Sequence, residues 1–182
     1  MTLLVREMTA ADCEAVARVR IRSWQHTYAG LMPRSYLDAM SVEEDAARRR
    51  EHLVKGGGQV IHLVAERAGR VVGWGCYGTS RDQDAPEEAA ELYALYVLPE
   101  HLATGVGRTL MDTLTKRAAA ERYPLLLLWV LAANTRARRF YAKAGFVADG
   151  AEESFTVDGV AVPEVRYARA LSASAAAAPS LG

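Results

Sequence analysis

ELYALYVLPEHLATGVGRTL, residues 91–110, predicts a buried strand that ends at Pro99, a short loop, and a helix that opens on Gly105 and Gly107. The first turn of a helix carries N–H groups without intrahelical partners, and the helix dipole adds partial positive charge there. Glycines let phosphate oxygens approach this backbone closely. The stretch therefore predicts an anion site, and we expect a pyrophosphate to bind it. A lone GxG pair also opens helices for purely structural reasons, so the rest of the chain must decide.

Two common nucleotide motifs do not fit these glycines. A Walker A loop ends in GKS or GKT, and here Arg108 and Thr109 follow Gly107. A dinucleotide fingerprint needs G-x-G-x-x-G with an acidic residue after a second parallel strand. Both motifs are therefore excluded.

The elements on either side predict a mixed α/β sheet with helices on both faces. Hydrophobic patterning, glycines and prolines indicate strands and helices in the order β, helices, β, β, β, α, β, α, β, β. The expected strands are Leu3–Glu7, Gln59–Arg67, Arg70–Thr79, Glu91–Leu98, Leu125–Leu131, Phe146–Val157 and Val162–Ala170. The expected helices run from the N-cap Thr9 to Gly30, and over Pro33–Met40, Val42–Lys55, Gly105–Arg122 and Asn134–Ala144. We expect one domain, residues 1–171, and a disordered Ala/Ser-rich tail, residues 172–182.

Composition is that of a globular protein of 182 residues, with 51% apolar and 24% charged residues. Lys+Arg and Asp+Glu both number 22, so no basic excess predicts nucleic-acid binding. The four histidines show no metal-ligand spacing, and no apolar run approaches the ~20 residues of a membrane helix. Cys13 and Cys76 are expected to be buried, reduced thiols, and the protein is expected to be cytoplasmic.

A second motif lies in NTRARRFYAKAGF, residues 134–146. Alone, Asn134 is most simply a helix N-cap, and Tyr141 beside Phe140 is most simply part of the core. Their combination with the glycine loop and the preceding apolar strand makes a functional interpretation stronger.

Together the two motifs resemble those of the GNAT superfamily of N-acetyltransferases. The chain carries the N…FY-x-K-x-GF signature at Asn134, Phe140, Tyr141, Lys143, Gly145 and Phe146. It departs from the acetyl-CoA loop pattern Q/R-x-x-G-x-G/A in having Leu102 at the Q/R position and Ala103 where glycine is frequent, while Gly105 and Gly107 match. The resemblance implies a mostly antiparallel, twisted sheet of about seven strands with helices on both faces. It also implies direct acetyl transfer from acetyl-CoA to an amine, without a metal.

The resemblance assigns roles to individual residues. Backbone groups of Leu95, Tyr96 and Val97 would pair with the pantetheine arm like an added strand. Asn134 would contact this arm, and the Tyr141 hydroxyl would protonate the departing thiolate. The pyrophosphate would be held by backbone N–H groups of Ala103, Thr104, Gly105, Val106, Gly107 and Arg108.

The attacking amine must lose a proton, because an amine with pKa near ~10 is protonated at pH 7. Glu91, at the start of the fourth strand, is the expected base, through water, and Glu87 and Glu88 are alternatives. An ordinary exposed strand-edge carboxylate is the other interpretation of Glu91. Family members that acetylate protein N-termini often have an acid where this chain has Trp129, which disfavours that acceptor.

The acceptor is expected to bind beside Trp24 and Tyr28, which share a helix face at i, i+4, unless this pair only anchors the helix. Carboxylates of the loop 80–89 (Asp82, Asp84, Glu87 and Glu88) would attract a cationic amine, unless they are simply solvated. We therefore expect a small-molecule primary amine as acceptor. A protein lysine or N-terminus is the alternative, and a non-catalytic acyl-CoA-binding module is a second. A homodimer is expected only by analogy.

Overall fold

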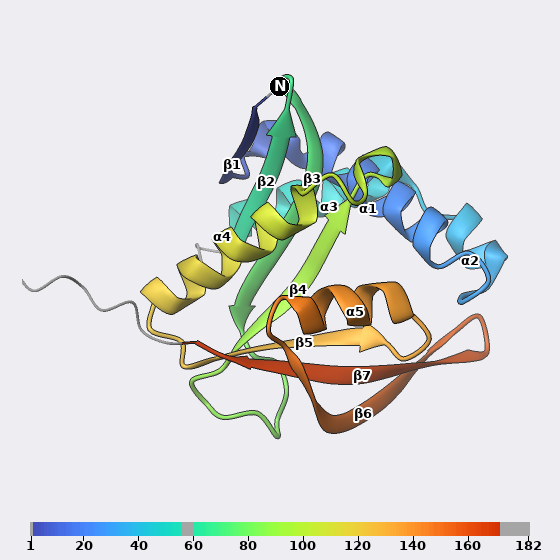
Figure 1. Ribbon diagram of the computed structural model, residues 1–182. Helices are drawn as coiled ribbons and strands as arrows, with labels where there is room; N and C mark the ends of the chain where they lie inside the picture. The colour runs from blue at the N-terminus through green and yellow to red at the C-terminus, as the bar shows by residue number, and fades with distance from the viewer. Residues whose placement is uncertain (1, 56–59, 172–182) are drawn as a thin grey trace, which may run out of the picture.

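The computed structural model (Figure 1) describes residues 2–55 and 60–171. Within these residues, seven strands form one sheet in the order β1-β2-β3-β4-β5-β7-β6. The strands are β1 Leu3–Glu7, β2 Ile61–Arg67, β3 Arg70–Thr79, β4 Ala90–Val97, β5 Leu125–Leu131, β6 Val147–Val157 and β7 Val160–Ala170. All neighbours are antiparallel except β4 and β5, which run parallel. The expected mixed, mostly antiparallel sheet is confirmed.

Helices cover both faces of this sheet, as expected. In the described residues the helices are η1 Ala10–Asp12, α1 Cys13–Thr27, α2 Arg34–Asp38, α3 Val42–Lys55, η2 Pro99–His101, α4 Val106–Ala120 and α5 Thr135–Lys143. Figure 1 shows α4 in front of the sheet and α3 behind it. The helix α5 lies on the α4 side, where Arg138 donates a hydrogen bond to the Tyr167 hydroxyl of β7.

Most predicted boundaries agree with the structure within one or two residues. The strands β1 and β5 and the helix α3 have the predicted ends. Thr9 and Asp12 form the predicted capping box, although its first turn is the 3₁₀ helix η1. The triple glycine 56–58, the start of the second strand at Gln59, and the tail 172–182 lie outside the described residues.

Two glycines of β3 position α4 on the sheet. A Cβ on Gly73 would stand 2.9 Å from Leu110 Cδ1, and one on Gly75 would stand 2.7 Å from Leu114 Cδ1. Both glycines of β3 make room for this helix, and Gly73 also borders an irregularity in which the register to β2 shifts between Ala65 and Glu66.

The strands β4 and β5 separate soon after they meet. Only Ala90 and Glu91 of β4 pair with β5, opposite Leu126 and Leu127. From Leu92 onward β4 keeps its bonds to β3 but has no partner on the side of β5. This separation leaves the edge of β4 open at the centre of the sheet, and the candidate site lies there.

Candidate active site

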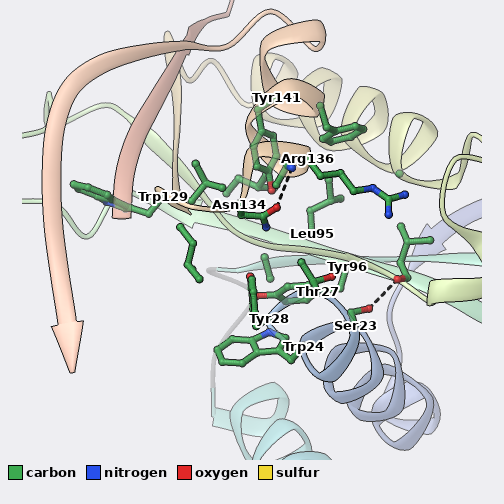
Figure 2. A pocket seen from close by; sticks show the side chains of 18 of the residues that line it. Ser23, Trp24, Thr27, Tyr28, Leu95, Tyr96, Trp129, Asn134, Arg136 and Tyr141 are labelled. Carbon is green, nitrogen blue, oxygen red and sulfur yellow. Dashed lines mark hydrogen bonds between the residues drawn. The ribbon is translucent and has the colours of Figure 1, made fainter. Parts of the chain in front are cut away.

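A cavity of about 760 Å³ opens where β4 and β5 separate (Figure 2). Its walls come from α1, β4, the loop before α4, the end of β5, α5 and the hairpin of β6 and β7. The chain thus brings together residues more than a hundred positions apart. Both sequence motifs contribute to its lining.

The glycine loop forms the cradle at one end. Ala103 and Gly105 both have left-handed backbone conformations, with φ of 61° and 90°. The amide of Thr109 bonds to the Gly105 carbonyl at 3.0 Å, so it starts the helical hydrogen bonds of α4. The N–H groups of the preceding residues, Val106 to Arg108, are those that a helix start leaves without intrahelical partners. The backbone is therefore suited to an anion, as the sequence predicted.

Side chains around the cradle hold the loop and leave its opening accessible. Arg67 of β2 donates to the Thr104 hydroxyl at 3.2 Å and to its carbonyl at 3.4 Å. A Cβ on Gly105 would have no atom within 4 Å, so the space over this residue is open. The side chain of Arg108 is 85% exposed and lies 3.9 Å from Asp112. Arg108 can therefore turn toward a bound phosphate at little cost.

The departure from the glycine pattern at Ala103 has an energetic consequence. A left-handed backbone costs an L-residue about 1–2 kcal/mol relative to glycine. We expect Ala103→Gly to raise the free energy of unfolding by about 0.5–1 kcal/mol, because the gain exceeds the extra chain entropy of glycine. Urea denaturation measures this difference. Ala142→Gly, at an exposed helical position of α5, should lower stability by about 1 kcal/mol. Equal effects of the two variants would contradict the assigned strain.

The free edge of β4 presents backbone groups to the cavity. Residues of an antiparallel strand alternately point their N–H and C=O toward and away from the partner strand. The Leu98 N–H bonds to β3, so Tyr96 also points its backbone to β3, whereas Leu95 and Val97 point theirs into the gap. The Ser23 hydroxyl of α1 donates to the Val97 carbonyl at 2.8 Å. Leu95 and the Val97 N–H thus offer the backbone edge, and Tyr96 lines the cavity beside them.

Asn134 and Tyr141 reach the cavity from α5. The Asn134 Oδ1 accepts a hydrogen bond from the Ala137 N–H at 3.1 Å, which confirms the N-cap, and the side chain is buried against the cavity (Figure 2). The Tyr141 ring packs edge-on against Phe140 and Phe146, with centroids 5.4 and 6.0 Å away. Burial, and then the neighbouring Tyr96, raise the pKa of Tyr141. The hydroxyl therefore stays protonated at neutral pH, as a proton donor must.

Glu91 is less exposed than either interpretation of the sequence implied. Its side chain lines the cavity but is buried, and it is not an exposed strand-edge carboxylate. Arg81, in the loop before β4, donates to both of its oxygens, at 3.0 Å from the backbone N–H and 2.5 Å from Nη2. The Arg81 side chain in turn stacks over the ring of Tyr93. The carboxylate of Glu91 is therefore already paired.

Aromatic residues of α1 form the opposite wall. Trp24 and Tyr28 meet edge to face with ring centroids 5.0 Å apart, and both line the cavity (Figure 2). Trp24 also lies against Tyr96 at 6.3 Å, so this wall continues to β4. The Trp24 Nε1 is buried and has no hydrogen-bond partner among the described residues.

Acidic groups reach the cavity from a different segment than the sequence predicted. Asp82 of the loop 80–89 accepts from Trp129 Nε1 at 2.9 Å and from Arg166 Nη1 at 3.1 Å. The other acids of the loop, Asp84, Glu87 and Glu88, are exposed and do not line the cavity. Glu153 of β6 and Glu164 of β7 line it instead. The strand alternation of this hairpin was the available signal, but it did not reveal which face meets the cavity.

Three other expectations concern metal ligands, membrane helices and the two cysteines. Between residues 2–55 and 60–171, no three His, Cys, Asp or Glu side chains cluster as metal ligands. In the same ranges, no helix has the length and apolar character needed to cross a membrane. Cys13 and Cys76 are both free and buried.

Comparison with known proteins identifies the family. The model of the acetyltransferase (GNAT) family matches residues 16–146. The uncharacterized N-acetyltransferase YuaI of Bacillus subtilis is 27% identical over 161 residues, which cover 88% of this chain and 89% of YuaI. The spermidine N(1)-acetyltransferase of Thermoplasma acidophilum is 24% identical over 157 residues, 85% of this chain and 94% of that enzyme.

Solved structures have the same fold. The PaiA N-acetyltransferase of Thermoplasma acidophilum, in complex with coenzyme A, superposes with a TM-score of 0.74 at 21% identity, and the match covers 93% of this chain and 99% of that one. The chain belongs to the GNAT acetyltransferase family. It is an N-acetyltransferase that uses acetyl-CoA.

The cavity fits this donor. The open space over Gly105 and the free N–H groups at the start of α4 suit the pyrophosphate. The edge of β4 at Leu95 and Val97 suits the extended arm, because it offers unpaired backbone groups in a gap between strands. Bound there, acetyl-CoA supplies an activated acetyl thioester.

Proposed function

We propose that the protein acetylates the primary amine of a small, positively charged molecule. The observation that carries this proposal is the pairing of aromatic and acidic walls at the acceptor end of the cavity. Trp24 and Tyr28 line this end with aromatic rings, of which Trp24 already stacks with the Arg20 guanidinium, and Glu153 and Glu164 offer carboxylates. A protein acceptor is the less favoured alternative, because Trp129 occupies the position where an acid would support an N-terminal acceptor.

A polyamine is a reasonable member of this acceptor class. The relative named spermidine N(1)-acetyltransferase matches along 94% of its own length, although at 24% identity. A polyamine with several ammonium groups can place one amine at the thioester and another near the carboxylates of the hairpin. Electrostatic attraction of this kind raises both affinity and association rate at low salt.

The residues at the cavity have distinct roles in the proposed reaction. Backbone groups of Leu95 and Val97 orient the extended arm of the donor, and Asn134 lies where it can contact the same arm. Tyr141 holds a protonated hydroxyl for the sulfur on which negative charge develops. Binding both reactants in one cavity speeds the reaction by positioning them for direct transfer. No covalent enzyme intermediate is therefore needed.

Release of free coenzyme A thiol, measured with a panel of acceptors, tests this function. We expect release with spermidine and simple diamines, and at least about tenfold slower release with α-amino acids, whose carboxylate is repelled by the acidic wall. Raising the salt concentration should increase KM for the diamines.

Other results would support the alternatives. Release only with lysine-containing or N-terminal peptides would identify a protein acceptor and contradict the small-molecule proposal. Coenzyme A binding without thiol release for any acceptor would favour a non-catalytic acyl-CoA-binding module. Titration calorimetry with acetyl-CoA separates this last result from a protein that fails to bind the donor.

A further inference from the structure

The sequence and the structure point to different residues as the proton acceptor of the reaction. Glu91 was expected there, yet its two oxygens already accept hydrogen bonds from Arg81. Both oxygens of Glu91 are therefore occupied by a fixed cationic partner in the described structure. Another group that faces the acceptor is therefore needed.

Glu164 lies on the wall that faces the acceptor. On β7 it stands opposite Leu131 of β5 on one side and Glu153 of β6 on the other. Leu131 and Glu153 also line the cavity, so this part of the wall is formed by three neighbouring strands. The position brings a carboxylate of the hairpin to the cavity wall at the end of β5.

The groups around Tyr28 show how close Glu164 comes to the reacting end. Burial raises the pKa of the Tyr28 hydroxyl. The neighbouring side chains of Tyr96, Tyr141 and Glu164 raise it further. Tyr28, Tyr141 and Glu164 all line the same cavity.

Charges around Glu164 leave it without a cationic partner. Within the described residues, Glu164 forms no ion pair or side-chain hydrogen bond. Arg166, two residues along β7, is held by Asp82 and Asp149. Arg81 is held by Glu91.

The titratable groups that face Glu164 are acids and a phenol. They are Glu153, opposite it on β6, and Glu91 on β4 and Tyr28 at the C-cap of α1, which line the same cavity. Burial, and then the negative charges of Glu153 and Glu91, raise the pKa of Glu164 to about 7. A general base is most effective when its pKa lies near the working pH.

We propose that Glu164 is the catalytic base, which accepts a proton from the acceptor ammonium group directly or through one water. This inference rests on the proposed function, because it assumes that an amine binds between α1 and the hairpin. Glu91 then has a structural role, as the partner that holds Arg81 and the loop 80–89 against β4.

The proton balance of the step is complete with the groups present. Glu164 takes one proton from the ammonium group, and the neutral nitrogen forms a C–N bond with the acetyl carbonyl carbon. The C–S bond breaks, and Tyr141 gives its proton to the sulfur. The Tyr141 oxygen recovers a proton from the acetylated nitrogen, and Glu164 releases its own proton to solvent.

Glu164→Gln tests this assignment, because glutamine keeps the shape of the side chain but cannot accept the proton. With acetyl-CoA and the panel amine of fastest turnover, we expect kcat to fall about 100-fold and the Kd of acetyl-CoA to stay unchanged. The kcat of the native enzyme should rise with pH up to about 7 and then level off. The variant should lose this rise.

Glu152→Gln is the matched control. Glu152 is an exposed glutamate on β6 that does not line the cavity, so the variant makes the same change of charge without altering the proposed site. It should keep the native kcat and the native pH profile. Equal losses in both variants would overturn the assignment, because they would indicate an effect of net charge alone.

A measurement of stability gives a readout independent of turnover. Because burial raises the pKa of Glu164, the native fold favours its protonated form, and this contribution to stability is lost as pH rises through about 7. Glu164→Gln should therefore raise Tm by about 2–4 °C at pH 8.5 and leave it unchanged near pH 4.

Three results would overturn the proposal. If the native enzyme is active and Glu164→Gln has the same pH profile, Glu164 is excluded as the base. The proposed function then stays intact. A raised KM with unchanged kcat would make Glu164 only a binding residue. Absence of thiol release from the native enzyme with every amine would instead refute the proposed function, and this proposal with it.

Discussion

Replacement of Tyr141 by phenylalanine is expected to lower kcat about 100-fold while the Kd of acetyl-CoA stays within about twofold. In the proposed reaction the hydroxyl donates a proton to the departing sulfur, and the ring makes the packing contacts with Phe140 and Phe146. Phenylalanine keeps these contacts and removes only the hydroxyl. The loss should therefore appear in the chemical step and not in donor binding.

Thiol release at saturating amine and titration calorimetry with acetyl-CoA measure the two quantities. Tyr77→Phe is a matched control, because the Tyr77 hydroxyl is buried without a hydrogen-bond partner in the described residues and does not line the cavity. It should retain native turnover. Native turnover in Tyr141→Phe would remove Tyr141 from the acid role.

A methyl group at Gly75 is expected to lower the free energy of unfolding by about 1–3 kcal/mol. The added Cβ would stand 2.7 Å from Leu114 Cδ1 and 3.1 Å from the Ala94 carbonyl oxygen. Leu114 is fully buried and Ala94 O belongs to the backbone, so neither can move away freely. The helix α4 would have to shift, and the cradle at its N-terminus would shift with it.

Urea denaturation and acetyl-CoA binding of Gly75→Ala measure both consequences. Gly107→Ala is the control for stability, because its Cβ would meet Phe140 and Val97 at ordinary contact distances of 3.6 Å. In the first turn of α4, alanine also favours the helix by up to about 1 kcal/mol. Stability should therefore stay equal or rise in Gly107→Ala. A loss of stability in this control as large as in Gly75→Ala would contradict the close approach of α4 to β3.

Local patterns account for the correct predictions from the sequence. The strand β5 and the helix α3 were predicted with their observed ends, because an apolar run, a capping serine and helical periodicity act within a few residues of one another. The Asn134 cap and the anion cradle before α4 are likewise helix-end features that the chain encodes locally. The family resemblance then related these local features to one cavity.

Contacts between distant segments could not be predicted in this way. Arg81 pairs with Glu91 only because the loop 80–89 folds back onto β4, and Asp82 is held away from the cavity by Arg166, eighty-four residues along the chain. The sequence around Glu164 shows an acidic residue in a strand. It does not show which face of that strand meets the cavity.

The sequence by itself determined the order of elements, the glycine-containing start of α4 and the positions of Asn134 and Tyr141 at α5, because each depends on residues close together in the chain. The tertiary structure alone decided which carboxylates reach the cavity. It placed Glu153 and Glu164 on the wall, and it paired Glu91 with Arg81. Burial and charge determine which carboxylate can accept a proton. Both depend on segments that meet only when the sheet is complete.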